Sequence, residues 1–97
     1  MPDAVVITGL GAVTPLGLGK QPFFDALAAG KSALTPIEGF DTAGHRSHLG
    51  AEIPEYAVKE FISLKGIRRM DRLSKLAATA ARMAVDDAGL NLSRGDN

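Results

Sequence analysis

The clearest pattern of apolar positions lies in the second half of the chain. From Ile67 to Ala88 apolar residues recur at the three- and four-residue spacing of one helix face, and they include Met70, Leu73, Ala77, Ala80, Ala84 and Ala88. Gly89 and Leu90 then follow in the order of a Schellman ending, with glycine in the left-handed position. The pattern predicts one helix over 67–88, whose alanine-rich face would let another backbone approach closely.

The first half of the chain alternates between short apolar runs and glycine-rich breaks. Ala4–Ile7 has no polar alternation, which is typical of a strand covered on both faces, and Ala12-Val13 would continue it. The glycines and proline of 14–19 predict a loop. Residues 23–29 predict a helix that ends at Gly30. Its apolar residues Phe23, Phe24, Leu27 and Ala28 would share one side.

The remaining segments are less regular. We predict a surface connection over 31–44, a short strand over 49–53 that Pro54 stops, and a polar loop over 93–97. The order strand, helix, strand, helix indicates an α/β layer, and so few elements rarely enclose a core. We therefore expect residues 1–97 to be one segment of a larger α/β domain. The isolated chain should be partly disordered, rearranged or associated.

Composition narrows the function classes. The 97 residues include eleven basic and eleven acidic side chains, so no overall field favours nucleic acid. No apolar stretch approaches the roughly 20 residues of a membrane span, and the N-terminus has no basic region of a signal peptide. We expect a cytoplasmic protein with neither nucleic acid nor membrane as a partner. The sequence has no cysteine, which excludes disulfides, thiolate metal sites and cysteine nucleophiles within it.

Three candidate chemical motifs are weak. Gly9-Leu10-Gly11 resembles part of a dinucleotide fingerprint but lacks the third glycine, so we interpret it as a turn. His45 and His48 lie three residues apart beside Glu52, in a glycine-flanked segment that suits exposed loop histidines better than a metal site. No serine lies in a nucleophile elbow. We expect no catalytic residue, metal site or cofactor in these 97 residues.

A cluster of positive charge precedes and overlaps the predicted long helix. Its residues fall within eleven positions, and Asp71 is the one acidic residue among them: Lys65, Arg68, Arg69, Arg72 and Lys75. On a continuous helix Arg68, Arg72 and Lys75 would share a face, and cations at a helix N-terminus oppose the macrodipole. Two interpretations stay open at this point. The cluster is either a solvated face paired elsewhere in the fold, or a docking patch for an anionic partner such as an acidic protein, RNA or phosphate.

Several segments together resemble one enzyme family. Residues 5–17, VVITGLGAVTPLG, resemble the opening of 3-oxoacyl-(acyl-carrier-protein) synthases of the synthase II type. Segments 23–32, 40–41, 50–53 and 65–90 follow in that family's order and spacing. The ketosynthases of aromatic polyketide pathways share this opening and the Arg-Arg-Met-Asp-Arg run at 68–72, so the two branches are not separated.

The resemblance implies a thiolase-like fold of layered α-β-α-β-α type, usually a homodimer. Such enzymes carry out a decarboxylative Claisen condensation of acyl and malonyl groups on acyl carrier protein, with a cysteine nucleophile and two histidines. The family's nucleophile and histidines lie beyond position 97, and His45 and His48 fall in a variable excursion. The resemblance thus implies a beta-ketoacyl synthase segment that is inactive by itself.

One functional feature transfers by position. Basic residues of the synthase II branch that contact acidic carrier protein match Lys65, Arg68 and Arg69. Three hypotheses follow: the N-terminal portion of a condensing enzyme, a non-catalytic carrier-binding module, or a chain-length-factor-like partner that lacks the active cysteine. The expected partners are acyl carrier protein and either the rest of the synthase or a homodimer mate.

Overall fold

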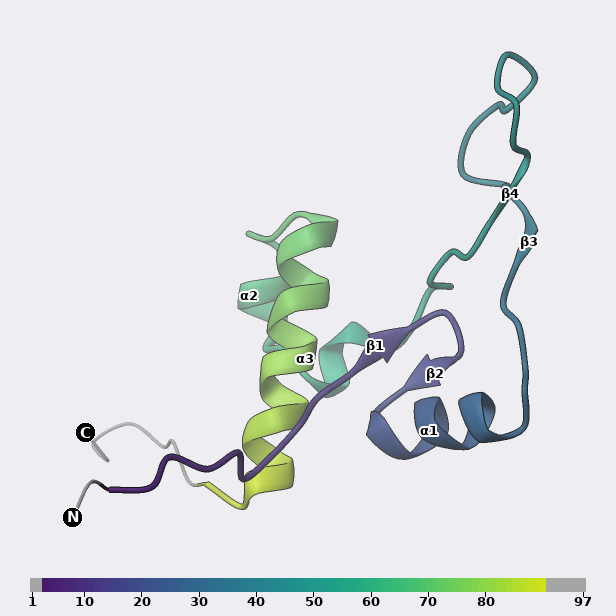
Figure 1. Cartoon of the computed structure of the whole chain (residues 1–97). Coiled ribbons are helices and arrows are strands. Elements are labelled where there is room, and N and C mark those ends of the chain that lie inside the picture. Colours follow the sequence, from purple (N-terminus) through teal and green to yellow (C-terminus); the bar gives the residue numbers. More distant parts are fainter. Residues whose placement is uncertain (1–2, 91–97) are drawn as a thin grey trace. The chain divides into compact units, whose positions relative to one another are not determined.

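The computed structural model describes residues 3–90, and these divide into two compact units. The first unit comprises 3–12 and 57–90, and contains the 3₁₀ turn η1 (Val58–Glu60) and helices α2 (Leu64–Ile67) and α3 (Arg72–Ala88). The second unit, 13–56, contains helix α1 (Lys20–Ala28) and strands β1 (Val13–Thr14), β2 (Gly17–Leu18), β3 (Thr35–Pro36) and β4 (Leu49–Gly50) (Figure 1). None of the helices in residues 3–90 combines the length and apolar character needed to cross a membrane.

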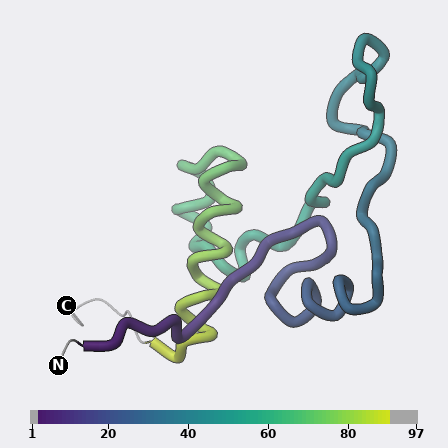
Figure 2. The backbone as a smooth tube through the Cα atoms, viewed as in Figure 1, coloured from purple at the N-terminus to yellow at the C-terminus, as the bar shows by residue number. Residues whose placement is uncertain are grey.

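The N-terminal segment of the first unit packs along α3, as the purple trace and the green-to-yellow helix show (Figure 2). A Cβ added to Gly11 would collide with the Ala80 carbonyl oxygen and lie 2.9 Å from the Ala84 nitrogen. One added to Gly9 would collide with the Ala84 carbonyl oxygen. The predicted close approach to an alanine-rich face is therefore confirmed. The turn predicted at Gly9-Leu10-Gly11 is wrong, because these residues form no turn and the two glycines serve packing.

The predicted strand over Ala4–Ile7 is wrong for the described structure. These residues are in no strand, and the side chains of Val5, Val6 and Ile7 are 98, 71 and 82% exposed. A strand requires a neighbouring strand for its backbone N–H and C=O groups. No segment within residues 3–90 pairs with this one, so the apolar run stays exposed.

The predicted helix over 67–88 begins five residues later, as α3 at Arg72, and Ile67 is the last residue of the separate helix α2. Asp71 has extended backbone angles, with φ −77° and ψ 178°, and its Oδ1 accepts a hydrogen bond from the Ser74 nitrogen at 2.8 Å. This N-cap starts α3 at Arg72. The predicted Schellman ending is confirmed, because Gly89 has φ 71° and the Leu90 nitrogen donates to the Val85 carbonyl at 3.2 Å.

Helix α1 in the second unit is confirmed as an element but differs from its predicted buried face. It begins at Lys20 and ends before Gly30, which has φ 72°. The Lys31 nitrogen donates to the Ala26 carbonyl at 3.0 Å, again closing a Schellman turn. Ala26 is buried, whereas Phe24 and Leu27 are 64 and 53% exposed. The small unit therefore covers only the Ala26 side of the helix.

The loops of the second unit contain two short antiparallel ladders. The predicted loop at 14–19 includes a tight hairpin, in which Val13 pairs with Leu18 and Thr14 with Gly17. In the other ladder Thr35 pairs with Gly50 and Pro36 with Leu49, so the predicted connection at 31–44 supplies a strand. The predicted strand at 49–53 shortens to Leu49–Gly50. The loop predicted at 93–97 lies outside the described residues.

Candidate docking surface

The predicted docking residues lie on α2 and the turn that follows it. The Ser63 hydroxyl oxygen caps this short helix by accepting a hydrogen bond from the Gly66 nitrogen at 3.2 Å. Lys65 lies within the helix and Arg68 is its C-cap. The Arg69 nitrogen donates to the Gly66 carbonyl at 3.1 Å, which continues the turn. The sequence of one capped helical turn therefore brings the three cations together.

All three side chains are exposed, and we call Lys65, Arg68 and Arg69 the basic patch. None of them makes a side-chain hydrogen bond or ion pair within the part of the chain that the structure describes. Three unneutralised cations within one turn produce a local positive potential that attracts an anionic surface.

The break at Asp71 changes the electrostatic argument made from the sequence. Arg68 and Arg69 follow the C-terminus of α2, and Lys65 is the second of its four residues, so none of the three lies in the first turn of a long helix. Carbonyl groups at a helix C-terminus favour positive charge, so Arg68 and Arg69 do not oppose the macrodipole as expected. The continuous face predicted for Arg68, Arg72 and Lys75 is wrong, because Arg72 and Lys75 begin a separate helix.

Asp71 supplies the acidic group beside the patch. The hydrogen bond from the Ser74 backbone lowers the pKa of its carboxyl, and the Ser74 side chain and the nearby Lys75 ammonium lower it further. Asp71 is therefore ionised at neutral pH, and its charge is engaged in capping α3. The basic patch keeps its excess of positive charge.

Two leucines near the patch were missed by the sequence argument. Leu64 in α2 and Leu73 in α3 are 60 and 76% exposed. Helical spacing predicted Leu73 on the buried face, but the new start of α3 at Arg72 places it in the first turn. The pattern of apolar residues gave no signal for this exposure, because the same spacing continues through the break.

The other candidate residues have local contacts. The ring of His45 lies edge-on to Phe40, with centroids 6.2 Å apart, and His48 Nδ1 lies 3.0 Å from Thr42 Oγ1. No group of three or more His, Cys, Asp or Glu side chains gathers within residues 3–90. Ser32 Oγ accepts a hydrogen bond from the Leu34 nitrogen at 3.2 Å, which is a turn contact.

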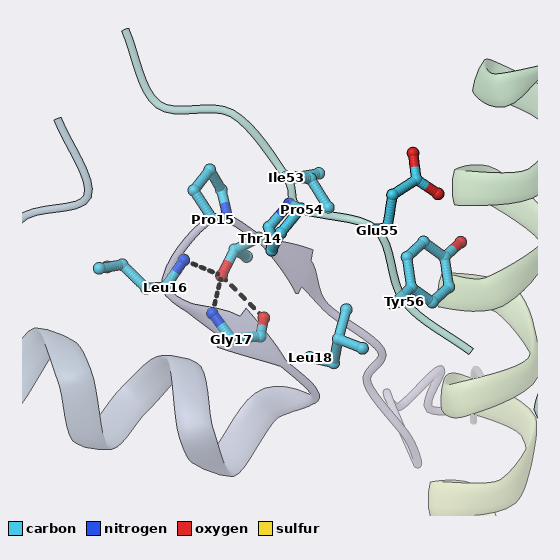
Figure 3. Close-up of a pocket in the computed structure, with 9 residues that line it drawn as sticks. All are labelled: Thr14, Pro15, Leu16, Gly17, Leu18, Ile53, Pro54, Glu55 and Tyr56. Carbon is cyan, nitrogen blue, oxygen red and sulfur yellow. Dashed lines mark hydrogen bonds between the residues drawn. The ribbon is translucent and has the colours of Figure 1, made fainter. Parts of the chain in front are cut away.

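A hollow of about 180 Å³ lies beside the β1–β2 hairpin (Figure 3). The Thr14 hydroxyl points back to the hairpin, where it accepts from the Leu16 and Gly17 nitrogens and donates to the Gly17 carbonyl. Most of the wall is apolar, with Pro15, Leu18 and Ile53 among its residues. The threonine hydroxyl thus makes its hydrogen bonds within the turn, and Glu55 and Tyr56 are the ionisable residues of the lining.

Comparison with known proteins gives a consistent result. The chain is 43% identical over 91 residues to the granaticin polyketide putative beta-ketoacyl synthase 1 of Streptomyces violaceoruber, covering 94% of this chain and 22% of that protein. It is 36% identical over 86 residues to the 3-oxoacyl-(acyl-carrier-protein) synthase 2 of Synechocystis, covering 89% and 21%. The chain spans about a fifth of the length of these relatives.

A solved structure agrees with this result. The ishigamide ketosynthase/chain length factor superimposes with a TM-score of 0.78 at 38% identity, covering 89% of this chain and 21% of that one. The predicted α/β class, as an incomplete part of a thiolase-like fold, is thereby confirmed. The family model for the beta-ketoacyl synthase N-terminal domain matches residues 2–97, and the chain therefore belongs to the beta-ketoacyl synthase family.

Proposed function

We propose that this chain is the N-terminal portion of a beta-ketoacyl-(acyl-carrier-protein) synthase. The match of residues 2–97 to the family's N-terminal domain carries this proposal. The complete enzyme would join acyl and malonyl groups by decarboxylative Claisen condensation, in fatty-acid or polyketide synthesis. Relatives of both kinds support the reaction class. The residues of the reaction would come from outside these 97 positions, and the cytoplasmic location stays a prediction.

The basic patch would act as the docking site for acyl carrier protein. Lys65, Arg68 and Arg69 are exposed and unneutralised by neighbours among the described residues. An acidic carrier surface would be steered to such a patch, with an association rate that falls as salt screens the charges. The patch contributes no reacting group, so its role is to position the carrier.

A second candidate is a chain-length-factor-like partner that pairs with an active synthase. The solved relative is a ketosynthase/chain length factor, and this observation favours keeping the second candidate. A thiol-directed acyl substrate analogue separates the two, since only an active synthase has the nucleophilic cysteine. Covalent labelling of the full protein supports the enzyme, and no labelling by a folded protein supports the partner. A non-catalytic carrier-binding module would also remain unlabelled. Unlike the chain-length-factor-like partner, it would not pair with an active synthase.

Docking is tested by measuring the affinity of acyl carrier protein for the full protein and for two triple variants. The first changes Lys65, Arg68 and Arg69 to Glu. The matched control changes Lys31, Arg46 and Lys59 to Glu, which are also exposed and give the same change in charge. We expect the patch variant to weaken binding by about 100-fold at low salt, on the scale of close charge pairs at interfaces. The control should change binding by less than about fivefold because it lies outside the patch.

The salt dependence gives a second readout. Wild-type binding should weaken between low and high salt, whereas the residual binding of the patch variant should depend much less on salt. Equal losses in both triple variants would show that net charge, and not the patch, governs binding. Unchanged binding by the patch variant would reject docking at these residues, and would leave the family assignment intact.

A further inference from the structure

The loop between β3 and β4 has little secondary structure to hold it. The two strands share two residue pairs, and the Ile37 nitrogen donates to the His48 carbonyl at 2.9 Å as one further bond. Pro36 has no N–H group to donate. A two-stranded ladder of this size is marginal in water. The loop over 37–48 therefore requires other interactions to keep one conformation.

Glu52 supplies such an interaction from just beyond β4. Its Oε1 accepts a hydrogen bond from the Glu38 nitrogen at 2.8 Å, and its Oε2 accepts one from the Gly39 nitrogen at 3.1 Å. One carboxylate thus joins two consecutive amides that are 14 and 13 residues away in sequence. Hydrogen bonds to an ionised acceptor are stronger than those between neutral groups.

Gly39 lies close to the same carboxylate. A Cβ at position 39 would lie 2.7 Å from Glu52 Oε2, which is closer than a carbon and oxygen can approach without displacement. The φ of Gly39 is not positive, so backbone conformation does not explain why a glycine occupies the position. A side chain at position 39 would require the Glu52 carboxylate to shift from its present place.

We propose that Glu52 and Gly39 form a latch that holds the 37–48 loop against the exit of β4. The two oxygens of the Glu52 carboxylate hold the start of the loop, and the glycine at position 39 leaves room for the carboxylate. The latched loop carries Phe40, which is 61% exposed and lies edge-on to His45. The latch is a conformational device within the second unit, and it is independent of docking at the basic patch.

Hydrogen–deuterium exchange of the full protein tests the latch. The variant Glu52→Gln keeps the size of the side chain but replaces one acceptor oxygen with a donor group, so the fork to two N–H groups is lost. We expect amides 38 and 39 to exchange about three- to tenfold faster. The matched control is Glu38→Gln, which also removes one negative charge from this contact region and leaves both backbone bonds to Glu52 intact. It should exchange as the wild type does.

Peptides from α3 report whether the effect is local. Exchange unchanged at 38 and 39 in Glu52→Gln, with α3 equally protected, would overturn the proposal. If Glu52→Gln also accelerates exchange in α3, the double variant with Gly39→Ala tests whether the two positions belong to one contact. A shared latch predicts that Glu52→Gln with Gly39→Ala exchanges no faster than the faster single variant. Multiplicative acceleration in the double variant would show two unrelated contacts and would also overturn the proposal.

Discussion

The most prominent contacts of the two compact units differ in kind. In the first unit, glycines of the N-terminal segment place its backbone directly against α3 at Ala80, Ala84 and Ala88. In the second, side-chain oxygens of Thr14 and Glu52 accept hydrogen bonds from backbone amides of turns and loops. The packing of the N-terminal segment on α3 therefore depends on the absence of side-chain volume at positions 9 and 11, with a hydrogen bond from the Leu10 nitrogen to Asp87 Oδ2 beside it, whereas the hairpin and loop of the second unit depend on particular oxygen atoms.

The lengths of the elements explain this difference. A helix of 17 residues such as α3 satisfies most of its own backbone groups and presents a continuous surface for packing. Strands of two residues satisfy few backbone groups, so the adjoining turns leave N–H groups that need other acceptors. Next to short elements, side-chain atoms therefore accept part of the backbone hydrogen bonds, and single polar atoms become important for stability.

The sharpest test of the comparison adds one methyl group to the first unit. The variant Gly11→Ala would place a carbon against the Ala80 carbonyl oxygen and the Ala84 nitrogen, and backbone atoms of a helix cannot move aside singly. We expect a loss of about 3 kcal/mol or more in the free energy of unfolding of the full protein, as for severe overpacking. Urea unfolding measures this loss, provided that the dependence of the free energy of unfolding on urea concentration is the same in the variant and the wild type.

A glycine in the second unit provides the control for this prediction. Gly44 has open space where its Cβ would lie, and its φ is not positive. The variant Gly44→Ala should therefore leave stability unchanged within about 0.5 kcal/mol. A similar loss at both positions would mean that glycine flexibility, and not the close backbone approach, sets the stability of the first unit.

The next largest effect is expected from a substitution that removes one oxygen atom from the second unit. Thr14→Val keeps the shape of the side chain but deletes the acceptor of the Leu16 and Gly17 amides and the donor to the Gly17 carbonyl. We expect a loss of about 1 kcal/mol, because the hairpin is half-buried and water replaces part of the bonding. Thr35→Val is the control, since Thr35 is exposed in β3. Equal stability in the two variants would contradict the role assigned to the Thr14 hydroxyl.

The sequence predicted features that depend on nearby residues. The glycine endings of α1 and α3 followed from Gly30 and Gly89, and the alanine-rich face of α3 indicated a close backbone neighbour. The break at Asp71 was missed because apolar spacing continues from α2 into α3. The Asp71-to-Ser74 spacing was the local sign of an N-cap.

Features that depend on distant residues were harder to predict. The run Ala4–Ile7 has strand composition, but composition does not reveal whether a pairing strand lies nearby. Two-residue ladders fall below the length at which alternation can be recognised. The charges of the basic patch were visible in the sequence, whereas their place within and just after α2 required the position of the helix break.

The smallest effect concerns the polar contact that begins α3 in the first unit. Hydrogen bonds from Ser74 hold the pKa of Asp71 below its ordinary value of 3.8. Because the pKa is lower in the folded state, the ionised cap stabilises α3 above this value, and the contribution is lost as pH falls through the lowered pKa. If backbone packing dominates the first unit, loss of the ionised cap should expose only the first turn of the helix.

Exchange of the Ser74 amide, corrected for its intrinsic pH dependence, should therefore accelerate more than that of amides near Ala84. The variant Asp71→Asn keeps a capping oxygen without a titrating group, so its corrected exchange should not change over the same range. Loss of protection along all of α3 would show instead that the cap, and not the glycine–alanine contact, maintains the helix.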